Sequence, residues 1–112
     1  MPITNKNMAA YPFLAEMYED DYFPNALVDK GKAILVRLCE QIEADQPESL
    51  DDLYALTHAA TEEFNDLAVE FEEEDSEIET GARDAIGGDF AAIAEAYGYD
   101  ADIEELTGTR EW

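Results

Sequence analysis

A polar stripe on one predicted helix carries the residue types that could do chemistry. The chain has a single histidine, and imidazole is the side chain that most readily takes up and releases a proton near neutral pH. Its polar neighbours are spaced three or four residues apart, which places them within about 60° of one another around a helix. Such a stripe could bind a small ligand or act as acid and base, and it comprises Tyr54, His58, Thr61 and Asn65.

A structural role is the competing interpretation of His58. A histidine beside the apolar side of a helix usually forms a hydrogen bond to a neighbouring element. Zinc and di-iron sites built from helical His and Glu residues need at least two histidines, and this chain has one. The sequence therefore predicts no metal site, no cofactor and no catalytic residue, and it favours a protein that is not an enzyme.

Cys39 is the only cysteine, so the chain can form no intramolecular disulfide. It lies near the apolar side of a predicted helix with no histidine close in sequence, which predicts a buried, unreactive thiol rather than a nucleophile. The sequence shows no secretory leader and no stretch of apolar residues long enough to cross a membrane. We therefore expect a cytoplasmic protein.

Carboxylates dominate the charge of the chain. There are 29 acidic and 6 basic residues, which gives a net charge of −23. Residues 1–47 hold 8 acidic and 4 basic side chains, whereas residues 48–112 hold 21 and 2. Phosphate backbones and anionic lipids repel such a surface, so we expect no direct binding to nucleic acid or to a membrane, and a basic protein as partner. The densest run lies within residues 70–79 and comprises Glu70, Glu72, Glu73, Glu74, Asp75, Glu77 and Glu79.

Apolar residues at helical spacing predict the elements that position these side chains. One helix spans Leu27 to Ile42, with a proline in its first turn. A second begins after Ser49, an N-cap with an acidic residue three positions on, and continues to Phe71. A third opens at a capping box formed by Ser76 and Glu79.

Glycines punctuate the third predicted helix. Gly87-Gly88 interrupts it, Asp89 caps a short continuation, and Gly98 ends that continuation in a left-handed conformation. Two weaker helices flank these elements. One begins at Asn7 or Tyr11 and buries Phe13, Leu14 and Met17, and the other is capped by Asp100 or Asp102.

No segment alternates apolar and polar residues in the manner of a strand. The sequence thus predicts a single all-α domain over residues 1–112, folded as a compact bundle of five or six short-to-medium helices with no significant sheet.

The segments FPNALVDKGKAILVRLCEQIE, LYALTHAATEEFNDL, SEIETGARDAIGGDF and the terminal TREW resemble a family of small bacterial proteins known only as a domain of unknown function. The resemblance covers nearly the whole chain. It implies a bacterial, single-domain, cytosolic protein. None of these segments is a catalytic motif, so no active residue carries over.

Together these observations favour a non-catalytic acidic protein-interaction module of the inhibitor, immunity or nucleic-acid-mimic type, acting through residues 48–112. Two alternatives stay open. One is a small-ligand binder or enzyme that uses the polar stripe around His58. The other is an acidic surface that serves only solubility or adaptation to salt. The sequence also leaves open the oligomeric state and whether Trp112 packs inward.

Overall fold

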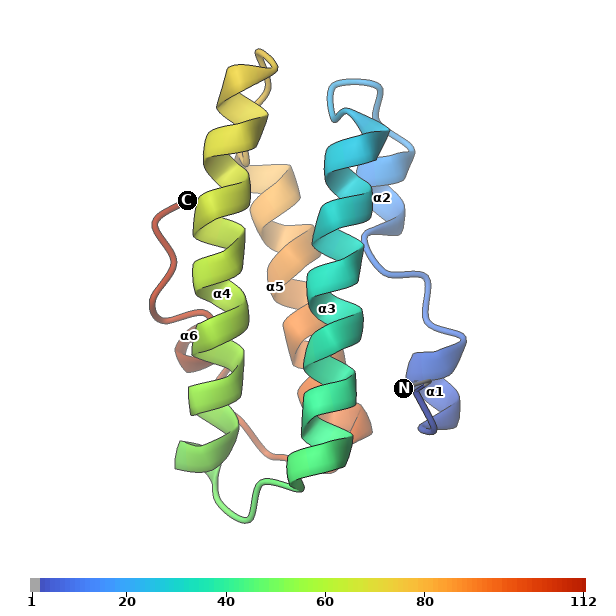
Figure 1. Ribbon diagram of the computed structural model, residues 1–112, viewed down its shortest axis with the longest axis vertical. Helices are drawn as coiled ribbons and strands as arrows, with labels where there is room; N and C mark the ends of the chain where they lie inside the picture. The colour runs from blue at the N-terminus through green and yellow to red at the C-terminus, as the bar shows by residue number, and fades with distance from the viewer. Residues whose placement is uncertain (1–2) are drawn as a thin grey trace.

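Three long helices and three single-turn helices make up the computed structural model, which describes residues 3–112 (Figure 1). No strand occurs within that range, so the predicted all-α class is confirmed. No helix in it is both long and apolar enough to cross a membrane. The helices are α1 (Lys6–Ala9), α2 (Ala15–Tyr18), α3 (Asn25–Asp45), α4 (Leu50–Glu73), α5 (Thr80–Ala96) and α6 (Ile103–Leu106).

α3 and α4 form an antiparallel pair at the centre of the molecule (Figure 1). α3 ends at Gln46, whose φ of 48° turns the chain. The predicted cap of α4 is confirmed, because Ser49 Oγ accepts a hydrogen bond from the backbone N–H of Asp52 at 3.1 Å. Gly31 lets the two helices approach closely. A Cβ atom at this glycine would lie 3.1 Å from Cε1 of Phe64.

α5 packs behind the α3–α4 pair (Figure 1). It contributes Ile86, Phe90 and Ile93 to the core. The rings of Phe64 and Phe90 meet edge to face, with centroids 6.0 Å apart. The predicted interruption at Gly87-Gly88 is wrong, because α5 runs without a break from Thr80 to Ala96. Its apolar side stays continuous across the two glycines, and that packing outweighs their weak helix preference.

Two predicted caps of this region are also wrong. Ser76 does not open α5, which begins four residues later, and its hydroxyl donates to the backbone carbonyl of Tyr22 at 3.0 Å instead. Asp89 is a buried residue inside α5 rather than a cap. Its carboxylate accepts hydrogen bonds from the backbone N–H of Leu14 at 2.8 Å and from the hydroxyl of Tyr11 at 3.0 Å.

The amino-terminal residues lie along one side of the bundle and the carboxy-terminal residues along the other (Figure 1). The one predicted amino-terminal helix is instead two short ones, α1 and α2. Phe13, Leu14 and Met17 are buried as predicted. Leu14 has a left-handed backbone, with φ of 56°, which the hydrogen bond to Asp89 holds in place.

Candidate functional site

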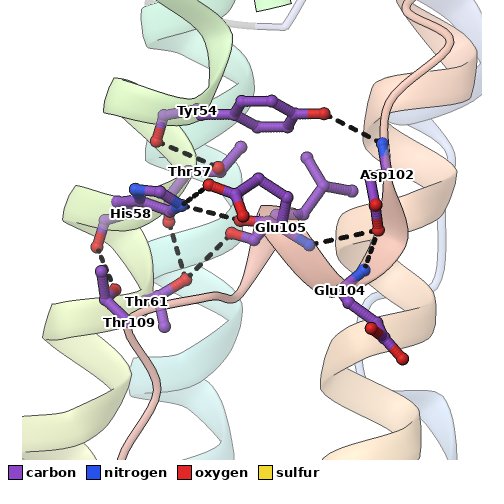
Figure 2. Close-up of polar contacts among 9 residues, drawn as sticks. Tyr54, Thr57, His58, Thr61, Asp102, Glu104, Glu105 and Thr109 are labelled. Atoms are coloured by element: carbon purple, nitrogen blue, oxygen red, sulfur yellow. Dashed lines mark hydrogen bonds and ion pairs between the residues drawn. The ribbon is translucent and has the colours of Figure 1, made fainter. Parts of the chain in front are cut away.

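The polar stripe of α4 is occupied by the chain's own carboxy-terminal segment. All four predicted side chains contact residues 102–111, as Figure 2 shows for Tyr54, His58 and Thr61. Tyr54 Oη accepts from the backbone N–H of Asp102 at 3.0 Å. Thr61 Oγ1 lies 2.8 Å from the carbonyl oxygen of Thr57, in its own helix, and 3.3 Å from that of Leu106.

His58 makes the shortest of these contacts, with Nε2 2.7 Å from the backbone carbonyl oxygen of Glu105. A carbonyl oxygen only accepts, so Nε2 must carry the proton in this hydrogen bond. The carboxylate of Glu105 lies 3.7 Å from the same nitrogen. The imidazole therefore acts as a donor that holds the backbone of α6 against α4.

Asn65 continues the series toward the end of the chain. Its amide nitrogen donates to the carbonyl of Thr109 at 3.1 Å, and its amide oxygen accepts from the backbone N–H of Glu111 at 2.8 Å. Contacts advance in the same direction along α4 and along the segment, so the two run parallel. Beyond them, Trp112 packs inward, with its ring centroid 6.1 Å from that of Phe64.

These contacts have a consequence for ligand binding. The four side chains are brought together as the helical spacing predicts, yet their polar groups bond to backbone groups of residues 102–111. A ligand could use the stripe only by displacing that segment, including Leu106, which is fully buried. The sequence spacing of these four residues predicts that they share one side of α4, but it does not predict that the carboxy-terminal segment covers that side.

A second candidate surface forms at the opposite end of α4, where the α2–α3 and α4–α5 connections meet (Figure 1). The hydrogen bond from Ser76 to Tyr22 joins the two connections, and the rings of Phe23 and Phe71 pack edge to face beneath them at 6.1 Å. Both connections carry exposed carboxylates. We call this surface the acidic end; it comprises Glu19, Asp20, Asp21, Glu72, Glu73, Glu74, Asp75, Glu77 and Glu79.

The acidic end differs in two ways from the predicted acidic run. It includes residues 19–21, which lie far from the run in sequence and come from the less acidic half of the chain. It also excludes Glu70, which is partly buried and forms an ion pair with Lys30, at 2.5 Å between Nζ and Oε1. Other carboxylates of residues 48–112 lie elsewhere, for example Asp51 and Asp52 in the first turn of α4.

Glu43 on α3 organises a third polar cluster, which fastens the amino-terminal residues. Its carboxylate accepts hydrogen bonds from the backbone N–H groups of Thr4 and Asn5 and from the hydroxyl of Tyr97. The hydrogen bond from Tyr97 is the main reason that the pKa of Glu43 falls to about 2. This carboxylate therefore has a structural role, which is to attach the amino-terminal residues to α3.

Cys39 lies next to this cluster and has no exposed surface. Burial raises the pKa of its thiol to about 12. A thiol with such a pKa is almost entirely protonated at neutral pH and is a poor nucleophile. The predicted burial of Cys39 is confirmed, and the raised pKa agrees with the predicted low reactivity.

The comparisons with known proteins point to a family without assigning an activity. Residues 7–112 match the model of a family of unknown function, DUF5713. No curated protein and no solved structure matched the chain.

Proposed function

We propose that this chain, which belongs to the DUF5713 family of unknown function, is a non-catalytic interaction module whose acidic end docks on a basic protein. The observation that carries this proposal is the convergence of two acidic connections, about fifty residues apart in sequence, on one end of the bundle. Acids that serve only solubility need no such convergence. The proposal includes a cytoplasmic location, which the lone cysteine favours.

The electrostatics of the acidic end support this assignment. Within residues 3–112, none of its nine carboxylates forms an ion pair. Glu72 and Glu73 lie in the last turn of α4, where the helix dipole adds further negative potential. Each such residue destabilises the helix by about 0.3–1 kcal/mol. No basic residue in the last turn of α4 offsets this loss of helix stability. Such an arrangement is expected of a surface whose charge is neutralised by a partner.

An exposed aromatic side chain adds contact area to this surface. Tyr22 belongs to the α2–α3 connection, its backbone carbonyl accepts the hydrogen bond from Ser76 of the α4–α5 connection, and 42% of its surface is exposed. Tyrosine is enriched at energetically important positions of interfaces, and its ring can accept the guanidinium or ammonium group of a basic partner. A surface of this kind suits an inhibitor, immunity protein or nucleic-acid mimic that covers the phosphate-binding surface of its partner.

Affinity capture at two salt concentrations tests the proposal, with the native lysate as source and three forms of the protein as bait. The test variant carries Glu72→Gln, Glu73→Gln and Glu74→Gln. The control variant carries three equal changes at exposed residues elsewhere, namely Glu48→Gln, Glu62→Gln and Glu95→Gln. Both variants have the same net charge, so a difference between them reports position rather than total charge.

We expect the wild-type and control proteins to retain one stoichiometric basic partner at low salt and to release it at high salt. The test variant should retain much less of it. Equal loss in both variants, or no basic partner on any bait, would contradict the proposal and favour an acidic surface that serves solubility alone.

A further inference from the structure

A pocket of about 640 Å³ lies between α5 and the carboxy-terminal segment. Four charged side chains of both signs line it: Arg83, Asp84, Glu104 and Arg110. The two arginines are the only basic residues in residues 48–112, where 21 residues are acidic. Residues 48–112 thus place both of their arginines at one pocket, although this half of the chain otherwise carries no lysine or arginine.

None of these four side chains is neutralised by another. Within residues 3–112, no ion pair involves any of them, although the two signs share one pocket. Nε of Arg83 is buried and has no hydrogen-bond partner. The guanidinium of Arg110 lies over the ring of Trp112, 5.7 Å from its centroid. A buried donor without an acceptor is rare in a folded protein, so the hydrogen-bonding capacity of the Arg83 guanidinium is not fully used within the fold.

Gly87 and Gly88, in the middle of α5, also line the pocket. Two consecutive glycines weaken a helix, so their presence needs a reason. Neither has a positive φ, and a Cβ atom at either position would meet no atom within 4 Å. Backbone conformation and close packing thus both fail to explain them. What they provide is open space next to the two arginines.

We propose that this pocket binds a small zwitterion of the amino-acid type. A carboxylate matches the planar donor fork of a guanidinium and would bind between Arg83 and Arg110. An ammonium group on the same molecule would be met by Asp84 and Glu104. A phosphate dianion fits this lining less well, because the two carboxylates would repel it. Ile103, which is 60% exposed, offers an apolar edge for a side chain such as that of leucine.

Arginine side-chain resonances provide a direct test, because the protein has only three arginines. We expect leucine to shift the Nε–Hε signals of Arg83 and Arg110 in a saturable manner. Arg37 lies on α3 and is ion-paired with Glu63 at 2.6 Å, so its signal serves as an internal control. N-acetyl-leucine lacks the ammonium group, leucinamide lacks the carboxylate, and each should bind more weakly than leucine.

Two variants sharpen the test. Arg83→Gln should weaken leucine binding by about tenfold or more, which is the size expected for one charge-assisted hydrogen bond, whereas Arg37→Gln should leave it unchanged. Gly87→Leu keeps every charge and introduces a better helix former, so it should fold while its side chain fills the pocket and abolishes binding.

The proposal is overturned if leucine causes no saturable shift at tens of millimolar, or if Gly87→Leu binds as well as the wild type. It is also overturned if N-acetyl-leucine or inorganic phosphate binds more tightly than leucine. None of these variants substitutes a residue of the acidic end, so failure here leaves the proposed protein interaction standing.

Discussion

His58 Nε2 donates a hydrogen bond to the backbone carbonyl of Glu105, 47 residues further along the chain and 2.7 Å away. This contact is the centre of a series that fastens the carboxy-terminal segment to α4. The series consists mainly of polar contacts to the backbone, whereas the long helices are held together by apolar side chains. The segment should therefore open more easily than the helices do.

Removing the imidazole should loosen the carboxy-terminal segment selectively. We expect His58→Ala to cost about 1 kcal/mol, the usual net value of one hydrogen bond. The emission of Trp112, the only tryptophan, should move to longer wavelength, and amide hydrogen exchange should speed up in residues 103–111. Glu62→Ala, at an exposed position of the same helix, is the control. Unchanged exchange in the segment would show that the imidazole does not hold it.

Two glycine substitutions should have opposite effects on stability. In Gly31→Ala, the new Cβ would lie 2.9 Å from Leu14 Cδ1 and 3.1 Å from Phe64 Cε1, both in the buried core. Overpacking of this kind costs about 1–3 kcal/mol and outweighs a gain in helix preference of up to about 1 kcal/mol. Gly87→Ala meets no atom and should stabilise by about 0.5–1 kcal/mol. Urea denaturation measures both, and the same sign for both would contradict the packing at Gly31.

Glu43 should stabilise the protein in a pH-dependent manner. The pKa of its carboxyl is about 2 in the folded state, below its ordinary value of 4.5, so the folded state favours the ionised form. The contribution is complete above about pH 4.5 and declines as the pH falls toward 2. Wild type should therefore exceed Glu43→Gln in stability at neutral pH, and the gap should shrink near about pH 3. A gap for Glu43→Gln that stays constant between neutral pH and about pH 3 would refute the assignment.

Asp89 should show the opposite dependence on pH. Burial is the main reason that the pKa of its carboxyl is raised, so the folded state binds this proton more tightly than the unfolded chain does. As the pH falls through the raised pKa, wild type should gain stability relative to Asp89→Asn, which cannot take up the proton. Denaturant unfolding at a series of pH values measures this difference. A wild type that loses stability relative to Asp89→Asn on acidification would contradict the raised pKa.

Asp89→Ala tests the hydrogen bonds of the same residue. It leaves the backbone N–H of Leu14 and the hydroxyl of Tyr11 without their acceptor. An unsatisfied buried group costs about 1–3 kcal/mol, so we expect a loss of that size. Tyr11→Phe removes only one of the two contacts and should cost less. Equal losses in the two variants would show that the hydrogen bond to Leu14 contributes nothing.

Local sequence patterns predicted the positions of the long helices well, but they predicted the hydrogen-bond partners of individual polar residues poorly. Ser49 and Ser76 both precede an acidic residue by three positions, yet only Ser49 caps a helix. The hydroxyl of Ser76 instead donates to the backbone carbonyl of Tyr22, more than fifty residues earlier in the chain. A local sequence pattern cannot predict a contact between residues so far apart. Asp89 likewise follows two glycines, a typical helix start, but its partners Tyr11 and Leu14 come from the amino-terminal segment.

The candidate sites follow the same division. A helical wheel is sufficient to place Tyr54, His58, Thr61 and Asn65 on one side of α4, because that depends on one helix alone. The segment that covers them and the meeting of residues 19–21 with residues 72–79 depend on how distant elements pack. The pocket with Arg83 and Arg110 depends on it as well, since the two arginines come from α5 and from the residues beyond α6.

The central position of the α3–α4 pair has a consequence for how the molecule assembles. These two helices are joined by only a few residues, so the entropy lost in closing that loop is small, and a hairpin of this kind is a natural nucleus for folding. α5 adds the next layer, and the chain ends attach through contacts between residues far apart in sequence. We expect the ends to dock last during refolding and to detach first during unfolding.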